Sequence, residues 1–240
     1  MLAFDALGDA GLSVQIAPLT NMEDQAVWTD EVIGGTGYAG SNIVREAAAR
    51  GHQVTSFSRT APAEQVAGVT YVTGSVLDGD VLAKTVTNTD ALVSALSPRG
   101  EMEGKTRGVL AAAAGLAKDA GVRFGVLGGA DSLLVSPEGP KVAQTDGFPD
   151  AFKPEAAEMG AVLDDLRASD SDLYWFFVSP AGGFGAWAPG EATGVFRIGD
   201  DVLLVDENGE SNISGADLAQ AIVDEIEQPT HLRRRFTVAY

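Results

Sequence analysis

Six residues near the start of the chain, Gly35-Thr36-Gly37-Tyr38-Ala39-Gly40, have the spacing G-x-G-x-x-G. Val32-Ile33 before them is typical of a strand end, and residues 38–50 combine good helix formers with an apolar face. Gly51 ends that helix, and residues 52–57 predict a second strand. A glycine turn between a strand and a helix directs backbone N–H groups and the positive end of the helix dipole at a pyrophosphate. In this context the spacing indicates a dinucleotide site; the alternative is a tight turn that binds nothing.

Arg59 follows at the end of the second strand, within Ser58-Arg59-Thr60. A carboxylate at this distance from the glycines would hydrogen-bond an adenosine ribose and repel a 2′-phosphate. The planar guanidinium of arginine instead suits a phosphate. The sequence therefore favours NADP(H) over NAD(H), and the alternative is an exposed arginine that contacts no ligand.

The composition argues against several other kinds of site. There is no cysteine for a disulfide or a thiol nucleophile, and only His52 and His231 are available as imidazole ligands, so we expect no metal site. The net charge of −18 disfavours nucleic acid. No apolar run is long enough for a membrane span, and the first residues lack the basic region of a secretory signal. We expect a cytoplasmic protein whose partner is a small-molecule acceptor, with its oligomeric state left open.

Alternating strands and helices must position these residues. The sequence predicts strands near residues 30–34, 52–57, 70–73, 91–96, 124–127, 173–178 and 235–239, and helices near 41–50, 78–85, 103–120, 153–168 and 214–227. This alternation implies a single Rossmann-type α/β domain over residues 32–240, with a doubly wound, mainly parallel sheet and helices on both faces. A small substrate region of about residues 181–213 includes a predicted hairpin of 195–198 with 202–205.

Residues 1–31 do not fit this pattern, because Thr29, Asp30 and Glu31 stand where a buried parallel strand is normally apolar. One interpretation is a short strand, roughly Asp30 to Gly34, with the acids at its exposed entry. The other is an appended or mis-registered segment, with native-like sequence beginning near Val32. The sequence leaves both open.

Several further segments follow the glycine turn in a characteristic order: ALVSALSP, GGADSL, FPDAFKPEA, FVSPA and LLVDENGESNISGADLAQAIVDE. In combination they resemble atypical short-chain dehydrogenase/reductase relatives over about residues 32–240. The chain looks most like the NADH-flavin reductase group of NAD(P)H-binding proteins, close to NmrA-like and biliverdin-reductase-B-like proteins. The resemblance implies a Rossmann fold with cofactor contacts at the glycine turn and Arg59, and near Ser75, Val76, Ser94, Ala95, Leu96, Ser179, Pro180 and Ala181. Many relatives have Asp where Ser75 stands.

The chain departs from typical short-chain dehydrogenases in its acid–base residues. Those enzymes use a Y-x-x-x-K pair, in which lysine lowers the pKa of the tyrosine. Here tyrosines stand only at positions 38, 71, 174 and 240, and none has a lysine four residues later. Phe152-Lys153 stands where such a tyrosine would be sought, and phenylalanine has no proton to give. Alcohol dehydrogenation by that mechanism is therefore disfavoured.

Hydride transfer to a flavin asks less of the protein, because the cofactor carries the chemistry and water can supply the proton. Phe184 and Trp187 in the loop 181–190 offer an aromatic face to such a ring, unless they only pack beneath the loop. The resemblance implies that Ser132 hydrogen-bonds substrate; the alternative is that it serves as a turn or N-cap serine. Lys153 is a further candidate for contact with the substrate; the alternative is a solvated lysine at the start of a helix.

We therefore expect an NAD(P)H-dependent oxidoreductase that reduces a flavin or similar planar acceptor. The alternative is an NmrA-like regulator that binds NADP and senses its redox state without turnover. A sugar-nucleotide epimerase or dehydratase fits less well, since the Tyr/Lys pair is absent and the C-terminal region is short.

Overall fold

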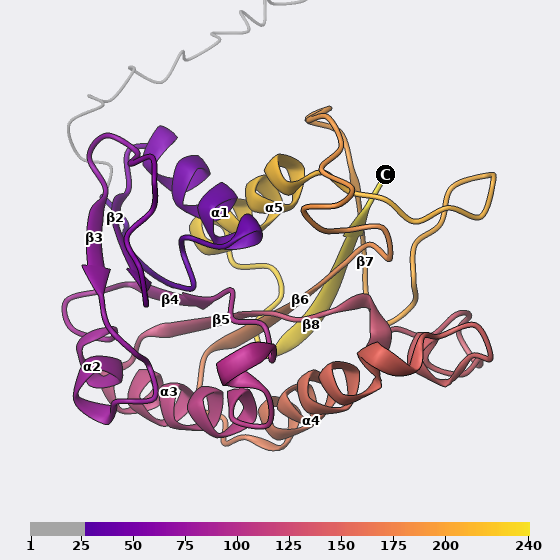
Figure 1. Ribbon diagram of the computed structural model, residues 1–240, viewed down its shortest axis with the longest axis horizontal. Coiled ribbons are helices and arrows are strands. Elements are labelled where there is room, and N and C mark those ends of the chain that lie inside the picture. The colour runs from indigo at the N-terminus through magenta and orange to yellow at the C-terminus, as the bar shows by residue number, and fades with distance from the viewer. Residues whose placement is uncertain (1–26) are drawn as a thin grey trace, which may run out of the picture.

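The computed structural model describes residues 27–240, which form one eight-stranded sheet with helices on both faces (Figure 1). Across the sheet the strand order is β3-β2-β1-β4-β5-β6-β8-β7. Every neighbouring pair is parallel except the edge pair β7 and β8. The strands are β1 (Thr29–Ile33), β2 (Gln53–Ser58), β3 (Thr70–Thr73), β4 (Ala91–Ser94), β5 (Arg123–Leu127), β6 (Trp175–Pro180), β7 (Arg197–Gly199) and β8 (Arg234–Ala239). This confirms the predicted doubly wound, mainly parallel Rossmann-type sheet.

In the described part of the chain, five α-helices cover the two faces of this sheet. They are α1 (Tyr38–Ala49), α2 (Gly79–Lys84), α3 (Thr106–Ala120), α4 (Lys153–Ala168) and α5 (Gly215–Glu227). Helices α1 and α5 lie on one face and α2, α3 and α4 on the other (Figure 1). Short 3₁₀ turns, η1 (Gly100–Met102), η2 (Ala130–Ser132), η3 (Val142–Gln144) and η4 (Asp150–Phe152), fill the connections after β4 and β5.

The central strand β1 shows how both faces are buried. Its Val32 belongs to the core under α1 and α5, whereas the next residue, Ile33, belongs to the core under α3 and α4. Successive strand side chains point to opposite faces, so a strand covered on both sides needs apolar residues at consecutive positions. The glycine turn therefore stands on a strand end fixed from both faces.

The acids of β1 do not lie at an exposed entry, so that prediction is wrong. Asp30 is 1% exposed and Glu31 is 7% exposed. The Oδ2 atom of Asp30 lies 2.5 Å from Nδ1 of His52, and burial raises the pKa of Glu31 to about 8. The pairing of β1 with β2 and β4 includes both residues. The alternative, an appended or mis-registered segment over residues 1–31, falls mostly on residues 1–26, which lie outside the described residues. Of its remaining residues, Thr29, Asp30 and Glu31 are part of β1.

The predicted hairpin of 195–198 with 202–205 is also wrong. Strand β7 instead pairs antiparallel with β8, placing Ile198 opposite Val238. Residues after β7 turn toward the connection between β5 and α4, where Leu203 donates its N–H to the carbonyl of Leu134. The open edge of β8 and this connection together supply the hydrogen bonds that a hairpin would have made.

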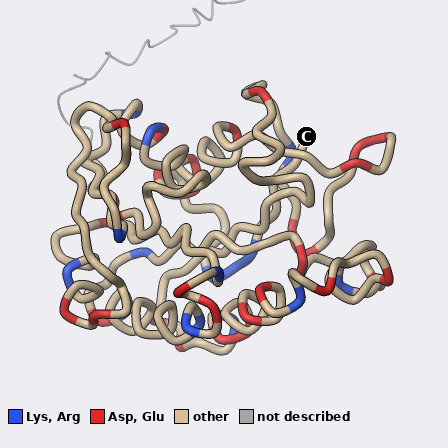
Figure 2. Tube along the Cα trace, in the orientation of Figure 1, with Lys and Arg blue, Asp and Glu red and all other residues tan. Residues whose placement is uncertain are grey.

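Acidic positions are spread over the helices and loops rather than gathered in one patch (Figure 2). They number 34 against 16 basic residues in the whole chain. Basic positions are scattered over the same elements, so the surface has an excess of negative charge without a single charged patch. Among the described residues, no helix is long and apolar enough to cross a membrane.

Candidate cofactor and acceptor site

The glycine turn between β1 and α1 brings backbone segments so close that side chains have no room. Gly34 has a φ of +80°, and a Cβ built on it would lie 2.9 Å from the carbonyl oxygen of Ala95. A Cβ on Gly40 would lie 2.2 Å from the carbonyl oxygen of Gly34. Helix α1 begins at Tyr38 without a side-chain cap, so its first-turn N–H groups remain available to an anion. The turn thus has the geometry of a pyrophosphate site.

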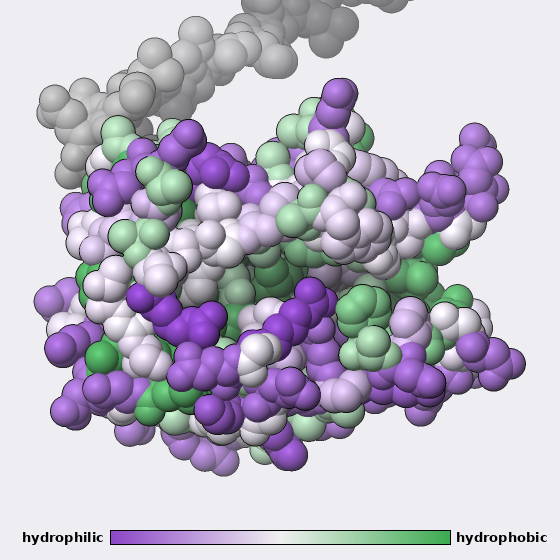
Figure 3. All heavy atoms as spheres, in the orientation of Figure 1, coloured by the Kyte–Doolittle hydropathy of each residue, from purple (hydrophilic) through white to green (hydrophobic). Residues whose placement is uncertain are grey.

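A pocket of about 310 Å³ lies beside this turn, at the ends of β2, β3 and β4. The main-chain N–H of Thr36 donates to Oγ of Ser58 over 3.1 Å, which joins the turn to the end of β2. Figure 3 shows this face hollowed between the α1/α5 layer and the α3/α4 layer, with hydrophobic residues at the bottom and hydrophilic ones on the rims. The pocket brings together eight of the predicted cofactor residues: Thr36, Gly37, Ser58, Arg59, Ser75, Val76, Ala95 and Leu96.

Other predicted residues support the pocket without lining it. Gly35 packs against the second strand, because a Cβ there would lie 2.3 Å from Oγ of Ser56. Ser94 is buried in β4. The segment Ser179-Pro180-Ala181 ends β6, two strands beyond β4, and lies farther along the same carboxyl edge of the sheet. Contact of these residues with a cofactor stays a prediction.

Two arginines stand on the rim of the pocket, and each is paired with a glutamate. Nη1 of Arg59 lies 3.0 Å from Oε2 of Glu101, and Nε of Arg99 lies 2.6 Å from Oε2 of Glu155. The side chains of Arg59 and Arg99 are 57% and 65% exposed. Arg99 is not among the residues predicted from the sequence, although its turn directly follows a predicted strand. The rim can therefore offer positive charge to a phosphate once these exposed pairs open.

Ser132 lies farther along the same edge, in the 3₁₀ turn η2 after β5. It is buried, and its Oγ accepts a hydrogen bond of 2.9 Å from Nη1 of Arg235. Arg235 is itself buried in β8, and its Nε donates to Oδ1 of Asp201 over 2.7 Å. Because the oxygen of Ser132 accepts from Arg235, the hydroxyl proton is free to be donated elsewhere. No local sequence signal links these two residues, which are 103 positions apart.

The predicted substrate residues are placed less closely together. Lys153 opens α4 and forms an exposed ion pair with Asp150 over 2.5 Å. The ring of Phe184 lies 5.5 Å from the ring of Tyr38, centroid to centroid, so the loop 181–190 reaches the glycine turn. Trp187 in the same loop is 76% exposed. Contact of these side chains with a substrate stays a prediction.

Three of the four tyrosine hydroxyls form hydrogen bonds within the described residues. The hydroxyl of Tyr38 donates to the carbonyl of Pro189, and that of Tyr240 donates to Asp217. Tyr71 accepts from the N–H of Val66. The last, Tyr174, directly precedes β6, at the end of the strand opposite the pocket.

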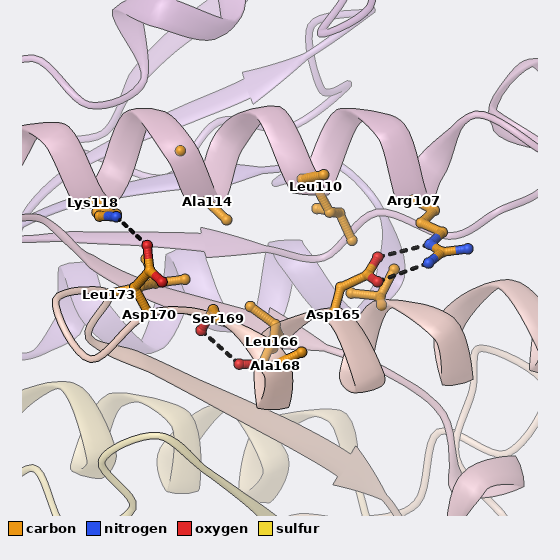
Figure 4. Close-up of a pocket in the computed structure, with 13 residues that line it drawn as sticks. Arg107, Leu110, Ala114, Lys118, Asp165, Leu166, Ala168, Ser169, Asp170 and Leu173 are labelled. Carbon is orange, nitrogen blue, oxygen red and sulfur yellow. Dashed lines mark hydrogen bonds and ion pairs between the residues drawn. The ribbon is translucent and has the colours of Figure 1, made fainter.

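A second hollow lies between α3 and α4 (Figure 4). Ion pairs span its two ends, Arg107 with Asp165 and Lys118 with Asp170. Between them the lining is mostly alanine and leucine. This hollow lies on the outer side of the helix pair and contains none of the predicted site residues, so we assign the site to the strand ends instead.

The sequence model of the NAD(P)H-binding family matches residues 34–229. The chain belongs to this family. Its model begins at the glycine turn and ends after α5, so it spans the pocket and the edge that carries Ser132. The chain is 36% identical over 209 residues to the uncharacterised protein YwnB of Bacillus subtilis, a match that covers 86% of this chain and 96% of that protein.

Two solved structures of similar proteins share the architecture. A provisionally named exported protein from Burkholderia pseudomallei is 40% identical, with a TM-score of 0.78 and coverage of 89% of this chain and 100% of that one. A provisionally named NADH-flavin reductase from Streptococcus pneumoniae is 32% identical, with a TM-score of 0.75 and coverage of 88% and 99%. These similarities extend over nearly the whole described chain.

Proposed function

We propose that this protein is an NAD(P)H-dependent reductase that passes hydride to a flavin or a similar planar acceptor. The observation that carries the proposal is the pocket at the strand ends beside the glycine turn, an arrangement that suits the pyrophosphate and adenosine of a dinucleotide. Membership of the NAD(P)H-binding family and the similarity to the streptococcal protein support it. The chain has no Tyr-x-x-x-Lys pair, so the acceptor is expected to be one that does not need proton transfer from such a tyrosine.

Arg59 supports NADP(H) as the preferred donor. Its guanidinium lines the pocket at the end of β2, where the adenosine ribose of a dinucleotide is expected. Its guanidinium forms an ion pair with Glu101, and a 2′-phosphate would displace that carboxylate. The loop 181–190 completes the proposal, because Phe184 and Trp187 can border the ring of the acceptor.

The direct test is the oxidation of NADPH and NADH with FMN, FAD, riboflavin and quinones as acceptors. We expect turnover with at least one of them and a lower KM for NADPH than for NADH. An absence of turnover with every acceptor would refute the proposal. Equal affinity for the oxidised and reduced cofactor, again without turnover, would instead favour a redox-sensing regulator.

A further inference from the structure

Asp131 carries a carboxylate that accepts hydrogen bonds from the backbone N–H groups of its own turn, at Asp131 and Ser132, but leaves one oxygen unpaired among the described residues. Within residues 27–240, its Oδ1 is buried without a hydrogen-bond partner. Its Oδ2 folds back over Gly129, since a Cβ built on that glycine would lie 2.2 Å from it. A buried carboxyl oxygen without a partner is costly for a purely structural residue. The side chain therefore has capacity to exchange a proton with a ligand.

The place of Asp131 in the fold is the edge that the cofactor pocket leads to. It lies in η2, four residues after β5 ends, and β5 is the neighbour of β4, whose end lines the pocket. A dinucleotide with its adenosine near Arg59 and its pyrophosphate at the N-terminus of α1 extends past β4 toward β5. The nicotinamide end is thereby directed to the turn that holds Asp131 and Ser132.

Charged groups face Asp131 from both sides of this edge. Glu155 approaches from α4, and its carboxylate also contacts Ser97 and Arg99 of the pocket rim. Arg235 approaches from β8, with its charge balanced by Asp201. Burial, reinforced by Glu155, raises the pKa of Asp131 to about 6, although backbone hydrogen bonds at Asp131 and Ser132 and the charge of Arg235 partly oppose the shift. A carboxyl group with this pKa can both hold and release a proton near neutrality.

We propose that Asp131 is the proton donor for the acceptor, a role that deepens the proposed reductase function and rests on it. Hydride leaves C4 of the dihydronicotinamide and forms a new bond to the acceptor, so the cofactor is oxidised and the acceptor reduced. The O–H bond of Asp131 breaks, and its proton joins the reduced nitrogen or oxygen of the acceptor. Water then returns a proton to the carboxylate. Ser132, fixed by Arg235, donates a hydrogen bond to the same acceptor.

Cofactor binding alone, without turnover, should change the protonation of Asp131. An oxidised nicotinamide ring is a cation, whereas the reduced ring is neutral. A cation facing Asp131 favours the carboxylate, so binding of NADP⁺ releases a proton that binding of NADPH does not. Calorimetric titration at pH 6 in two buffers of different ionisation enthalpy measures this release. We expect a difference between the two cofactors of up to about half a proton, because the group is then about half protonated.

The variants Asp131→Asn and Asp146→Asn make a matched pair. Asp146 is an exposed carboxylate in the same connection between β5 and α4, so its variant should keep the redox-dependent proton release. Asp131→Asn should abolish it while still binding both cofactors, which also shows that the variant is folded. An unchanged release in Asp131→Asn, or no release in the wild type, would overturn the role of Asp131.

Kinetics supply the second readout. Above its pKa, loss of the Asp131 proton should lower kcat about tenfold per pH unit, and Asp131→Asn should lack this slope. We expect that variant to lose about 10²-fold in kcat at pH 6 with little change in the KM for NADPH, and Asp131→Glu to recover part of the rate. A wild-type profile kept by Asp131→Asn would contradict the proposal. If none of the acceptors supports turnover, the reductase function is contradicted instead. The proton-release measurement then still decides whether Asp131 faces the nicotinamide ring.

Discussion

Gly40→Ala tests whether the turn depends on close backbone contact. The added Cβ would lie 2.2 Å from the carbonyl oxygen of Gly34, and 2.8 Å from both the carbonyl carbon of Gly34 and Cα of Gly35. These distances are roughly 1 Å shorter than ordinary contact. All three atoms are backbone, so no side chain can rotate away to relieve the overlap. The start of α1 must instead move away from the end of β1.

The magnitude follows from two opposing effects. Overlap in a packed region costs about 1–3 kcal/mol, and its backbone nature places it near the upper value. Alanine gains up to about 1 kcal/mol over glycine within a helix. The net loss in the free energy of unfolding is therefore about 2 kcal/mol. Gly160→Ala in α4 is the matched control, because nothing lies within 4 Å of its added Cβ and only the gain applies.

Thermal unfolding and NADPH titration check both consequences. The two variants should differ by about 3 kcal/mol, which corresponds to roughly 6–12 °C in Tm for a chain of this size. Gly40→Ala should also weaken NADPH binding at least about tenfold, since the displaced turn misaligns the N–H groups that face the pyrophosphate. Equal Tm values for Gly40→Ala and Gly160→Ala, with an unchanged Kd, would refute the reasoning.

Three further predictions concern charged residues. Because burial raises the pKa of Glu31 from 4.5 to about 8, the folded chain keeps a proton there that the unfolded chain has lost, so stability falls as the pH rises between these values. Denaturant titrations across that range should show a shallower fall for Glu31→Gln, and identical slopes would contradict this. Arg59→Ala should weaken NADPH binding about 10- to 100-fold and leave NADH binding nearly unchanged. Glu101→Gln should strengthen NADPH binding only a few-fold, because it removes an exposed ion pair. Fluorescence titration measures both affinities, and an unchanged preference for NADPH in Arg59→Ala would exclude binding of the 2′-phosphate by Arg59. Asp217 is buried and accepts hydrogen bonds from the loop 190–195 and from Tyr240. The substitution Asp217→Asn should therefore lower the free energy of unfolding by about 1–3 kcal/mol, as measured by urea denaturation. A loss within error of zero would show that other contacts hold the loop.

Local patterns in the sequence were sufficient to predict the turn and most of the sheet. The glycine turn requires small residues at fixed positions, because Gly34 and Gly40 lie directly against backbone atoms. The apolar runs and their spacing reflect strands covered on both faces. The end of β2 could be located from the turn, which is why Arg59 was found and does line the pocket. All of these features depend on neighbours close in the chain.

Features that depend on distant partners could not be read in the same way. Arg235 contacts Ser132 across 103 positions, and Arg99 meets Glu155 across 56. The edge pairing of β7 with β8 was missed because residues 202–205 have strand-like composition of their own. The composition of residues 202–205 indicates that they can form a strand, but it does not indicate which segment they pair with. Their hydrogen bonds instead depend on the connection after β5, while β7 pairs with the edge of β8.

Strand β1 is a buried strand although two of its five residues are acidic, so here too the surrounding structure outweighs local composition. Asp30 to Ile33 pair with a parallel strand on each side, although Asp30 and Glu31 are poor residues for a buried position. His52 meets Asp30 on one face, whereas burial leaves Glu31 with its pKa raised on the other. The backbone pairing and the apolar pair Val32 and Ile33 therefore hold the strand in place against the cost of its acids. The glycine turn that begins at the next residue consequently owes its position to β2, β4 and α1 more than to the side chains at the start of its own strand.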